Sequence, residues 1–228
     1  MATPSLHSVL HAAATINGLA CFDTGHGDTV VTWGTGPTHN TVDGWQQFVR
    51  EHTLNQPQSD GPYTGGVVGW LGYEAGGSVE RMPTPIGPRP THDVCLWRTD
   101  GALVLSNGAR EWSIHGSNAF QKSALELLDK ARNSNGIEQP LQKPTSLAHP
   151  NPAQGDRFQA GVQRILDHIR SGEVYQVSYA WEHAPMPIEN AWAVWLLLRE
   201  KNPALRGCYL RNSGTEIVSN SPELFLEY

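Results

Sequence analysis

The chain has 228 residues, of which 39% are hydrophobic and 17% are charged, so it is long enough for one or two domains and is not wholly disordered. The formal net charge is −6. Because no cluster of lysine and arginine is present, we expect neither nucleic acid nor a membrane surface as a partner.

The N-terminal part of the chain predicts strands and one helix. Residues 18–23 and 29–33 are short β-type runs separated by turn-forming residues at 25–28. A helix is expected after Asp43, with its apolar face formed by Trp45, Phe48, Val49 and Leu54. The next strand-like run, 63–74, is interrupted by glycines, which mark tight sheet packing or the close approach of a ligand. We expect tight packing.

The middle of the chain predicts strands and a second helix. The expected strands are residues 93–98, 102–106 and 110–115. The first two should form a hairpin through Asp100-Gly101, which is a strong signal for a tight turn. The helix should be capped by Asn118 and present five apolar residues on one face: Phe120, Ala124, Leu127, Leu128 and Ala131.

A polar stretch rich in proline divides the chain. Residues 133–154 show no apolar periodicity, as expected of a linker or a long surface crossing. We therefore predict an N-terminal region at 1–140, a linker at 141–155 and a C-terminal region at 156–228.

The C-terminal region begins with the most regular pattern. Asp156 should cap a helix that ends at Gly172 and whose apolar residues recur at helical spacing: Phe158, Val162, Ile165, Leu166 and Ile169. Residues 174–183 then predict a strand with Gln176 and Ser178 on one polar face.

The last part predicts a helix from Asn190, a hairpin across residues 212–214 and a final strand at 223–228. Glu223 starts this strand beside Leu224 and Phe225. Apolar neighbours raise the pKa of a carboxylic acid, which is the condition for a general acid. The same residues also fit an ordinary turn, and the residue types alone leave both interpretations open.

Cellular location follows from the cysteines and the N-terminus. The three cysteines are widely spaced and form no Cys-x-x-Cys site, as is typical of a reducing compartment. The stretch Gly18–Cys21 resembles a lipoprotein cleavage site, but no lysine or arginine precedes Arg50, so the positive region of an export signal is missing. The apolar run 191–198 is far shorter than a membrane span. We expect a cytoplasmic protein.

Three segments carry motifs in a specific order: 63–83, 158–178 and 221–226. The second reads Ser-Gly-Glu-Val-Tyr-Gln-Val-Ser and the third Ser-Pro-Glu-Leu-Phe-Leu. Together they resemble the large subunits of chorismate-utilising enzymes, aminodeoxychorismate synthase component I and anthranilate synthase component I. The resemblance implies an α+β fold, an antiparallel β-sandwich with outer helices. Since family members are much longer, it also implies that the chain is truncated: an N-terminal half whose residues 156–228 begin an incomplete chorismate-binding catalytic region.

The resemblance implies one catalytic residue and one reaction. Glu223 matches the glutamate of the Ser-Pro-Glu motif, which acts as the general acid for loss of the chorismate 4-hydroxyl. The implied reaction is amination of chorismate to 4-amino-4-deoxychorismate, for p-aminobenzoate and folate, with ammonia from a glutamine amidotransferase subunit. Mg²⁺ is the implied cofactor, with its ligands expected in the missing C-terminal part and none in this chain. The fragment alone is expected to be inactive.

The family's tryptophan pocket maps onto Thr24, Leu205, Arg206 and Gly207. Residues 19–24 read Leu-Ala-Cys-Phe-Asp-Thr, where anthranilate synthases carry a Leu-Leu-Glu-Ser type sequence. Leu205-Arg206 replaces the family's Pro-Tyr or Pro-Phe. Both departures argue against tryptophan binding and favour the folate-pathway enzyme.

Three alternatives stay open at this point. The first is anthranilate synthase component I of tryptophan biosynthesis, because the deciding residue lies beyond Tyr228. The second is a non-catalytic module that docks a glutamine amidotransferase or a complementing C-terminal half. The third is a truncated product without function of its own, which would expose unpaired strand edges and aggregate.

Overall fold

The computed structural model describes residues 3–34, 36–53, 63–81, 92–133, 152–180 and 187–224. The chain divides into two compact units. Unit 1 consists of Met1–Leu141 together with Asn190–Tyr228, and unit 2 consists of Gln142–Glu189. Unit 2 therefore starts beside the boundary expected at residue 141, whereas the last part of the chain returns to unit 1.

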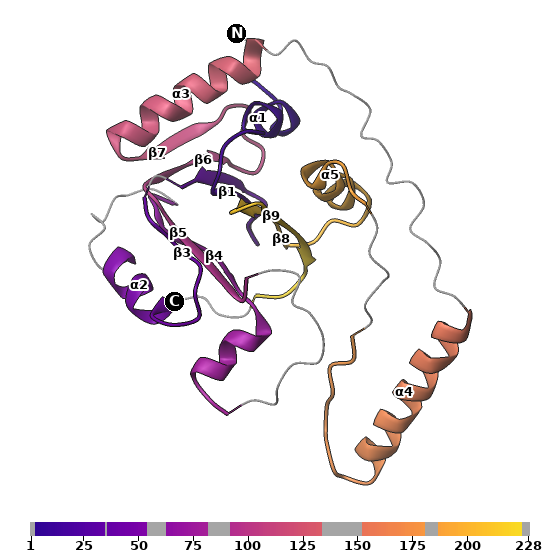
Figure 1. Ribbon diagram of the computed structural model, residues 1–228. Coiled ribbons are helices and arrows are strands. Elements are labelled where there is room, and N and C mark those ends of the chain that lie inside the picture. The colour runs from indigo at the N-terminus through magenta and orange to yellow at the C-terminus, as the bar shows by residue number, and fades with distance from the viewer. Residues whose placement is uncertain are drawn as a thin grey trace. The chain divides into compact units, whose positions relative to one another are not determined.

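A six-stranded antiparallel sheet is the centre of unit 1 (Figure 1). Its strands, in spatial order, are β7 (Ser113–Gly116), β6 (Gly101–Leu105), β2 (Thr29–Trp33), β1 (Leu19–Asp23), β8 (Arg206–Asn212) and β9 (Thr215–Ser221). The predicted pairing of residues 18–23 with 29–33 and the predicted hairpin across 212–214 are both confirmed. β1 lies between β2 and β8, so strands from the two ends of the chain are neighbours.

A second, three-stranded antiparallel sheet has the order β3 (Thr38–His39), β5 (Val94–Thr99) and β4 (Gly66–Leu71). The predicted hairpin of residues 93–98 with 102–106 is therefore wrong, because β5 belongs to this sheet while β6 belongs to the six-stranded one. Asp100-Gly101 carries the chain from one sheet to the other. Gly101 fits this crossing because a Cβ there would lie only 2.5 Å from the Phe120 ring.

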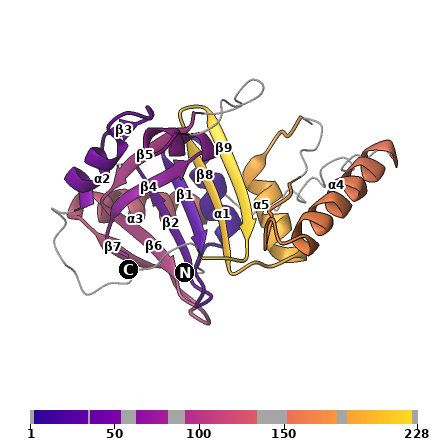
Figure 2. The same ribbon diagram turned by 90° about the horizontal axis from the view of Figure 1, so that it is seen from below.

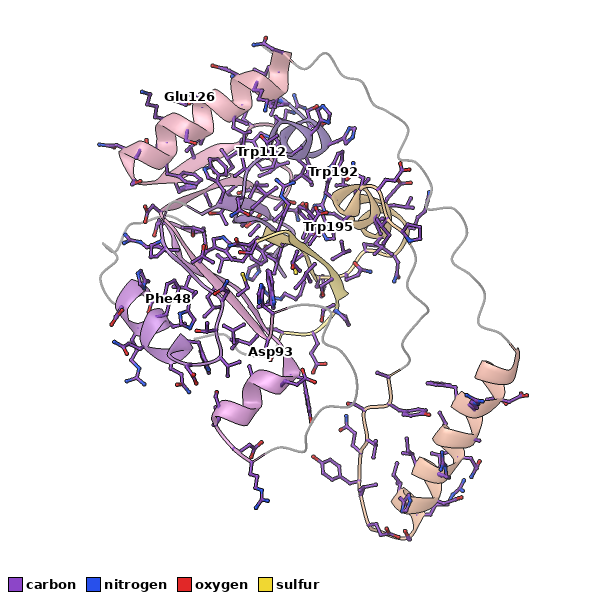
Figure 3. The ribbon with its side chains drawn as sticks, viewed as in Figure 1. Phe48, Asp93, Trp112, Glu126, Trp192 and Trp195 are labelled. Atoms are coloured by element: carbon purple, nitrogen blue, oxygen red, sulfur yellow. The ribbon has the colours of Figure 1, made fainter. Side chains whose placement is uncertain are left out.

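Three helices cover one face of the six-stranded sheet: α1 (Leu6–Ala12), α3 (Asn118–Asn133) and α5 (Ala191–Lys201). The five predicted apolar residues of α3 are all buried. Figure 3 shows Trp112, Trp192 and Trp195 gathered in this core. The cap of α3 is not Asn118 but Ser117, whose hydroxyl accepts a hydrogen bond from the Phe120 amide at 3.2 Å.

The other face of the six-stranded sheet shares a core with the three-stranded sheet. Ala20 and Leu210 from the larger sheet contact Val68, Cys95 and Trp97 from the smaller one. On the far side of the smaller sheet lie α2 (Trp45–Thr53) and the 3₁₀ helix η1 (Tyr73–Ser78), around the buried Phe48. Figure 2 shows these elements from a second side. Leu54, expected on the face of α2, lies outside the described residues. The mixed helix and sheet class and the antiparallel pairing are confirmed.

In unit 2, the helix α4 (Pro152–Arg170) begins earlier than the cap predicted at Asp156. Proline is well suited to this first helical position, because the first amides of a helix have no internal partner. Gly172 follows the helix with φ +78°, as predicted for a C-terminal cap. Its amide donates to the Ile169 carbonyl at 3.1 Å.

The strand predicted at 174–183 is wrong for residues 174–180, and residues 181–183 lie outside the described part of the chain. Residues 174–180 have no strand partner among the described residues, and a strand exists only with a neighbour to bond. All of these side chains are exposed, Tyr175 by 91%. Tyr179 stacks on Phe158 of α4, with ring centres 5.0 Å apart.

Candidate functional site

Glu223 lies just after β9 and is exposed. Its amide donates to the Ser221 hydroxyl at 3.4 Å, which is a turn contact. Of the two interpretations left open by the residue types, the described residues fit the ordinary turn and not a buried carboxyl, since Leu224 is itself 42% exposed. Phe225 and the rest of the strand expected at 223–228 lie outside the described residues, and residues 223–224 are not in a strand.

Three of the four residues expected around a tryptophan pocket come together where β1 ends and β8 begins. Strand pairing sets Phe22 opposite Cys208, which places Thr24 near Arg206. The Thr24 hydroxyl accepts from the Asp28 amide at 3.1 Å and so holds the β1–β2 turn. The Arg206 side chain lies against that turn, since a Cβ on Gly25 would be 2.8 Å from it. The fourth residue, Leu205, is 63% exposed to solvent.

Gly207 faces a group of polar side chains that the sequence did not single out. Arg199 of α5 donates through Nε to both oxygens of Asp23, at 2.8 and 2.9 Å. Its Nη2 donates to the Thr29 hydroxyl at 2.6 Å. The guanidinium also lies 5.8 Å from the centre of the Trp195 ring. This cluster ties α5 to β1 and β2.

Burial controls the protonation of this cluster. The pKa of the Asp23 carboxyl is raised, because the loss of solvent outweighs the Arg199 and Thr29 bonds that lower it. The Trp195 Nε1 is buried and has no hydrogen-bond partner within the described structure. A Cβ on Gly207 would lie 3.3 Å from both Trp195 Nε1 and Asp23 Oδ2, so any side chain at position 207 would press against both groups.

The signal for this cluster was present in the sequence but weak. Asp23 is the only charged residue of β1, and Arg199 is the first charge after the apolar run 191–198. A charge at the end of an otherwise apolar element often has a partner. Nothing local, however, identifies a partner that lies 176 positions away in the sequence.

A shallow depression of about 340 Å³ lies at the other end of β1 and β8. Its lining residues are Ala14, Thr15, Ile16, Asn17, Arg211, Gly214 and Glu216. The Arg211 guanidinium donates to the carbonyls of Ala13, Ala14 and Ile16. Its charge therefore caps the end of α1 instead of facing a ligand.

The resemblance places the Mg²⁺ ligands outside this chain. Within the described ranges, no group of three or more His, Cys, Asp or Glu side chains is placed to hold a metal ion. In the same part of the chain, no helix combines the length and apolar character needed to span a membrane.

The two buried cysteines, Cys21 and Cys95, provide a test of the core of unit 1. Burial raises the pKa of the Cys21 thiol well above its ordinary value and that of Cys95 to about 11. Since the thiolate is the reactive form, both should resist iodoacetamide at about pH 8 in the folded protein. Mass spectrometry should find Cys21 and Cys95 labelled only after unfolding in urea. Rapid labelling of Cys21 without urea would contradict its position in the core.

This chain resembles known proteins in sequence and in fold. The profile of a family described as chorismate binding enzyme matches residues 11–228. Anthranilate synthase alpha subunit 2 of Oryza sativa subsp. japonica is 27% identical over 215 residues, which cover 80% of this chain and 33% of that protein. Aminodeoxychorismate synthase component 1 of Bacillus subtilis (strain 168) is 24% identical over 173 residues, covering 72% and 37%. The crystal structure of anthranilate synthase component I from Streptococcus pneumoniae TIGR4 matches with a TM-score of 0.54 and 19% identity, covering 90% of this chain and 48% of that one.

The chain therefore belongs to the chorismate-binding enzyme family. It spans 33% and 37% of the length of these two curated relatives, and 48% of the solved chain. The structural match shows the same mixed helix and sheet fold. The two relatives carry the names of different synthases, so the family is defined while the reaction is not.

Proposed function

We propose that this chain is part of an aminodeoxychorismate synthase of the component I type. The reaction replaces the 4-hydroxyl of chorismate with an amino group. Ammonia forms the new C–N bond and gives up a proton, and the hydroxyl leaves as water after receiving one. The observation that carries the proposal is the Ser221-Pro222-Glu223 motif at the end of β9, in a chain that the family profile matches to residue 228.

Glu223 is the proposed acid that protonates the leaving hydroxyl. Its exposed position after β9 leaves the carboxyl accessible to a substrate. An acid in this role works best once neighbouring groups exclude water, so the proposal requires polypeptide beyond the described residues to cover it.

The choice of amination at C4 over anthranilate formation rests on the region around Gly207. The resemblance assigns Thr24, Arg206 and Gly207 to a tryptophan pocket, but Asp23 and Arg199 already neutralise each other beside these residues. An amino acid ligand needs partners for both its ammonium and its carboxylate. This pairing supports an enzyme without tryptophan feedback. Anthranilate synthase is the second candidate, favoured by the name of the rice relative.

Two further parts of the proposal concern partners. A glutamine amidotransferase is the proposed source of ammonia, and Mg²⁺ is the proposed cofactor. Because the described residues hold no metal-binding group, none of the steps above is assigned to the metal. We place its ligands in polypeptide that this chain does not include.

Glu223→Gln tests the catalytic assignment in the complete protein that contains these residues. We expect kcat for aminodeoxychorismate formation, with chorismate, Mg²⁺ and ammonia, to fall by about 100-fold or more, since general acids contribute roughly 10²–10⁴-fold. The KM for chorismate should change little. Glu126→Gln, an exposed carboxylate of α3 labelled in Figure 3, is the control and should leave both constants unchanged.

The product decides between the two synthases. Chromatography should detect 4-amino-4-deoxychorismate and no anthranilate. Anthranilate as the main product would replace the proposal with the second candidate, and full activity of Glu223→Gln would remove Glu223 from the mechanism. The 228-residue chain alone should form neither product.

A further inference from the structure

Two asparagine–glycine pairs lie within the described residues, Asn17-Gly18 and Asn107-Gly108. In such a pair the backbone nitrogen of the glycine can attack the side-chain carbonyl carbon of the asparagine, because the glycine has no Cβ to hinder the approach. The attack requires an asparagine side chain that can leave its place and a backbone that can bend around it. The structure separates the two pairs on this requirement.

The side chain of Asn17 is held at both ends of its amide group. Its Nδ2 donates to Oδ1 of Asn212 at 3.2 Å, and its Oδ1 accepts from the amide of Ser213 at 3.2 Å. Gly18 is buried, and its carbonyl accepts from the Gly34 amide at 2.9 Å. Attack on Asn17 would break both side-chain bonds, so it requires local opening of the structure.

Asn107 lies in the turn between β6 and β7, where both Asn107 and Gly108 are exposed. The side chain makes one long contact, from Nδ2 to the His26 carbonyl at 3.4 Å. No hydrogen bond from the Gly108 amide is present among the described residues. A Cβ on Gly108 would meet nothing within 4 Å, so this part of the turn has room to bend. The pair is therefore accessible in the folded chain.

Asn107 is also where this turn contacts the turn between β1 and β2. Its backbone amide donates to Oδ1 of Asp28 at 2.8 Å. Its side chain lies directly on the second turn, since a Cβ on Gly27 would be 2.8 Å from the Asn107 Nδ2. A negative charge on the side chain at position 107 would therefore repel the Asp28 carboxylate at short range.

We propose that Asn107 is a site of spontaneous deamidation and that the carboxylate formed there weakens the contact between the two turns. The Gly108 nitrogen forms a bond to the side-chain carbonyl carbon of Asn107, and its proton leaves with the side-chain nitrogen as ammonia. Water then adds to either carbonyl of the cyclic imide and breaks one of its two C–N bonds. The products are aspartate and isoaspartate, and water is the co-reactant. The proposal does not depend on which reaction the enzyme catalyses.

Peptide mapping of the complete protein that contains these residues tests the site. Trypsin releases Asn107 in the peptide 99–110 and Asn17 in the peptide 1–50. Incubation in heavy-oxygen water at mildly alkaline pH labels each new carboxylate, so that deamidation during digestion in ordinary water is not counted. In urea, the two sites should react at similar rates. In the folded protein, Asn17 should slow by about 100-fold or more, whereas Asn107 should stay within about 10-fold of its unfolded rate.

A double-mutant cycle tests the effect on the turns. Asn107→Asp introduces the charge of the product without lengthening the backbone, and it should lower the thermal midpoint by about 2–4 °C. Asp28→Asn keeps an acceptor for the Asn107 amide but removes the opposing charge. In that background Asn107→Asp should shift the midpoint by less than about 1 °C.

Each result decides for or against the proposal. Equal slowing of Asn17 and Asn107 in the folded protein would overturn it, and so would the absence of slowing at both sites, because the fold would then not select Asn107. Aspartate without isoaspartate at position 107 would exclude the cyclic imide and overturn the proposed step. Equal effects of Asn107→Asp in the two backgrounds would overturn the coupling between the turns. None of these measurements requires catalysis, so they are independent of the Glu223 assay.

Discussion

The substitution Gly69→Ala is expected to lower the free energy of unfolding by about 3 kcal/mol or more, a large share of the roughly 5–15 kcal/mol that stabilises a typical domain. Gly69 lies in β4 opposite Leu96, with φ +153°. A Cβ there would overlap the backbone carbonyl oxygen of Cys95 in β5. The strand pair would have to separate, which would open the core around Trp97.

Gly66→Ala on the same strand is the matched control. Gly66 has φ +144°, yet a Cβ there would meet nothing within 4 Å. This variant carries the backbone strain without the clash and should lose about 1 kcal/mol. Urea unfolding followed by tryptophan fluorescence measures both. Equal losses at the two positions would show that β4 and β5 do not approach this closely, and would reopen the ligand interpretation of the glycine-rich run.

Arg199→Met is expected to lower the free energy of unfolding by about 2 kcal/mol at neutral pH, because it leaves Asp23 charged and largely buried. The side chains are 35% and 11% exposed, so the loss should be smaller than for a fully buried pair. Arg132→Met is the control. Arg132 pairs with Asp129 on the surface of α3, and this variant should be nearly neutral.

The pH dependence of this loss has a definite sign. The pKa of Asp23 in the folded chain is above its ordinary value of 3.8, and removal of Arg199 raises it further. The folded variant therefore holds the Asp23 proton more tightly than the unfolded one. The stability lost through Arg199→Met should be small below about pH 4 and should grow as the pH rises through the pKa of Asp23 in the folded variant.

Asp23→Asn in the Arg199→Met background should recover part of the stability, because no uncompensated charge is left. Urea unfolding at several pH values gives all the terms of this double-mutant cycle. A deficit that is constant with pH would mean that Arg199 acts through packing of its stem and not through its charge.

The helices of this protein were predictable because their information is local. The spacing of Phe120, Ala124 and Leu127 defined the buried face of α3, and the helix expected from Asn190 begins at Ala191 with Asn190 as its cap. Most of the strands were also found, since β-branched runs between turn residues mark them, but the helix α1 and the short strand β3 were not predicted, and residues 174–180 form no strand. What failed was pairing. Asp100-Gly101 has the composition of a hairpin turn, but whether β5 and β6 bond to each other depends on β2 and β4, which are distant in sequence.

The candidate site shows the same division. Sequence motifs were sufficient to propose Glu223 and to single out Thr24, Arg206 and Gly207, which lie close together in the structure. They could not reveal the contact of Arg199 with Asp23, which exists only because α5 packs on the sheet. The residue types around Glu223 left burial and an ordinary turn both open for a related reason. Leu224 supplies apolar surface, but desolvation requires a layer of atoms on top, and the described residues provide none.

The central place of β1 has a consequence for the order of events during synthesis. Arg211 of β8 bonds the Ile16 carbonyl, just before β1, across 195 positions of the sequence. Contacts this distant close large loops and form slowly. On the ribosome, β1 can pair with β2 early but must wait for β8 until residues 206–212 have emerged. Because unit 2 is inserted before that last partner, a pause in its translation would leave the first strand of the protein with an open edge.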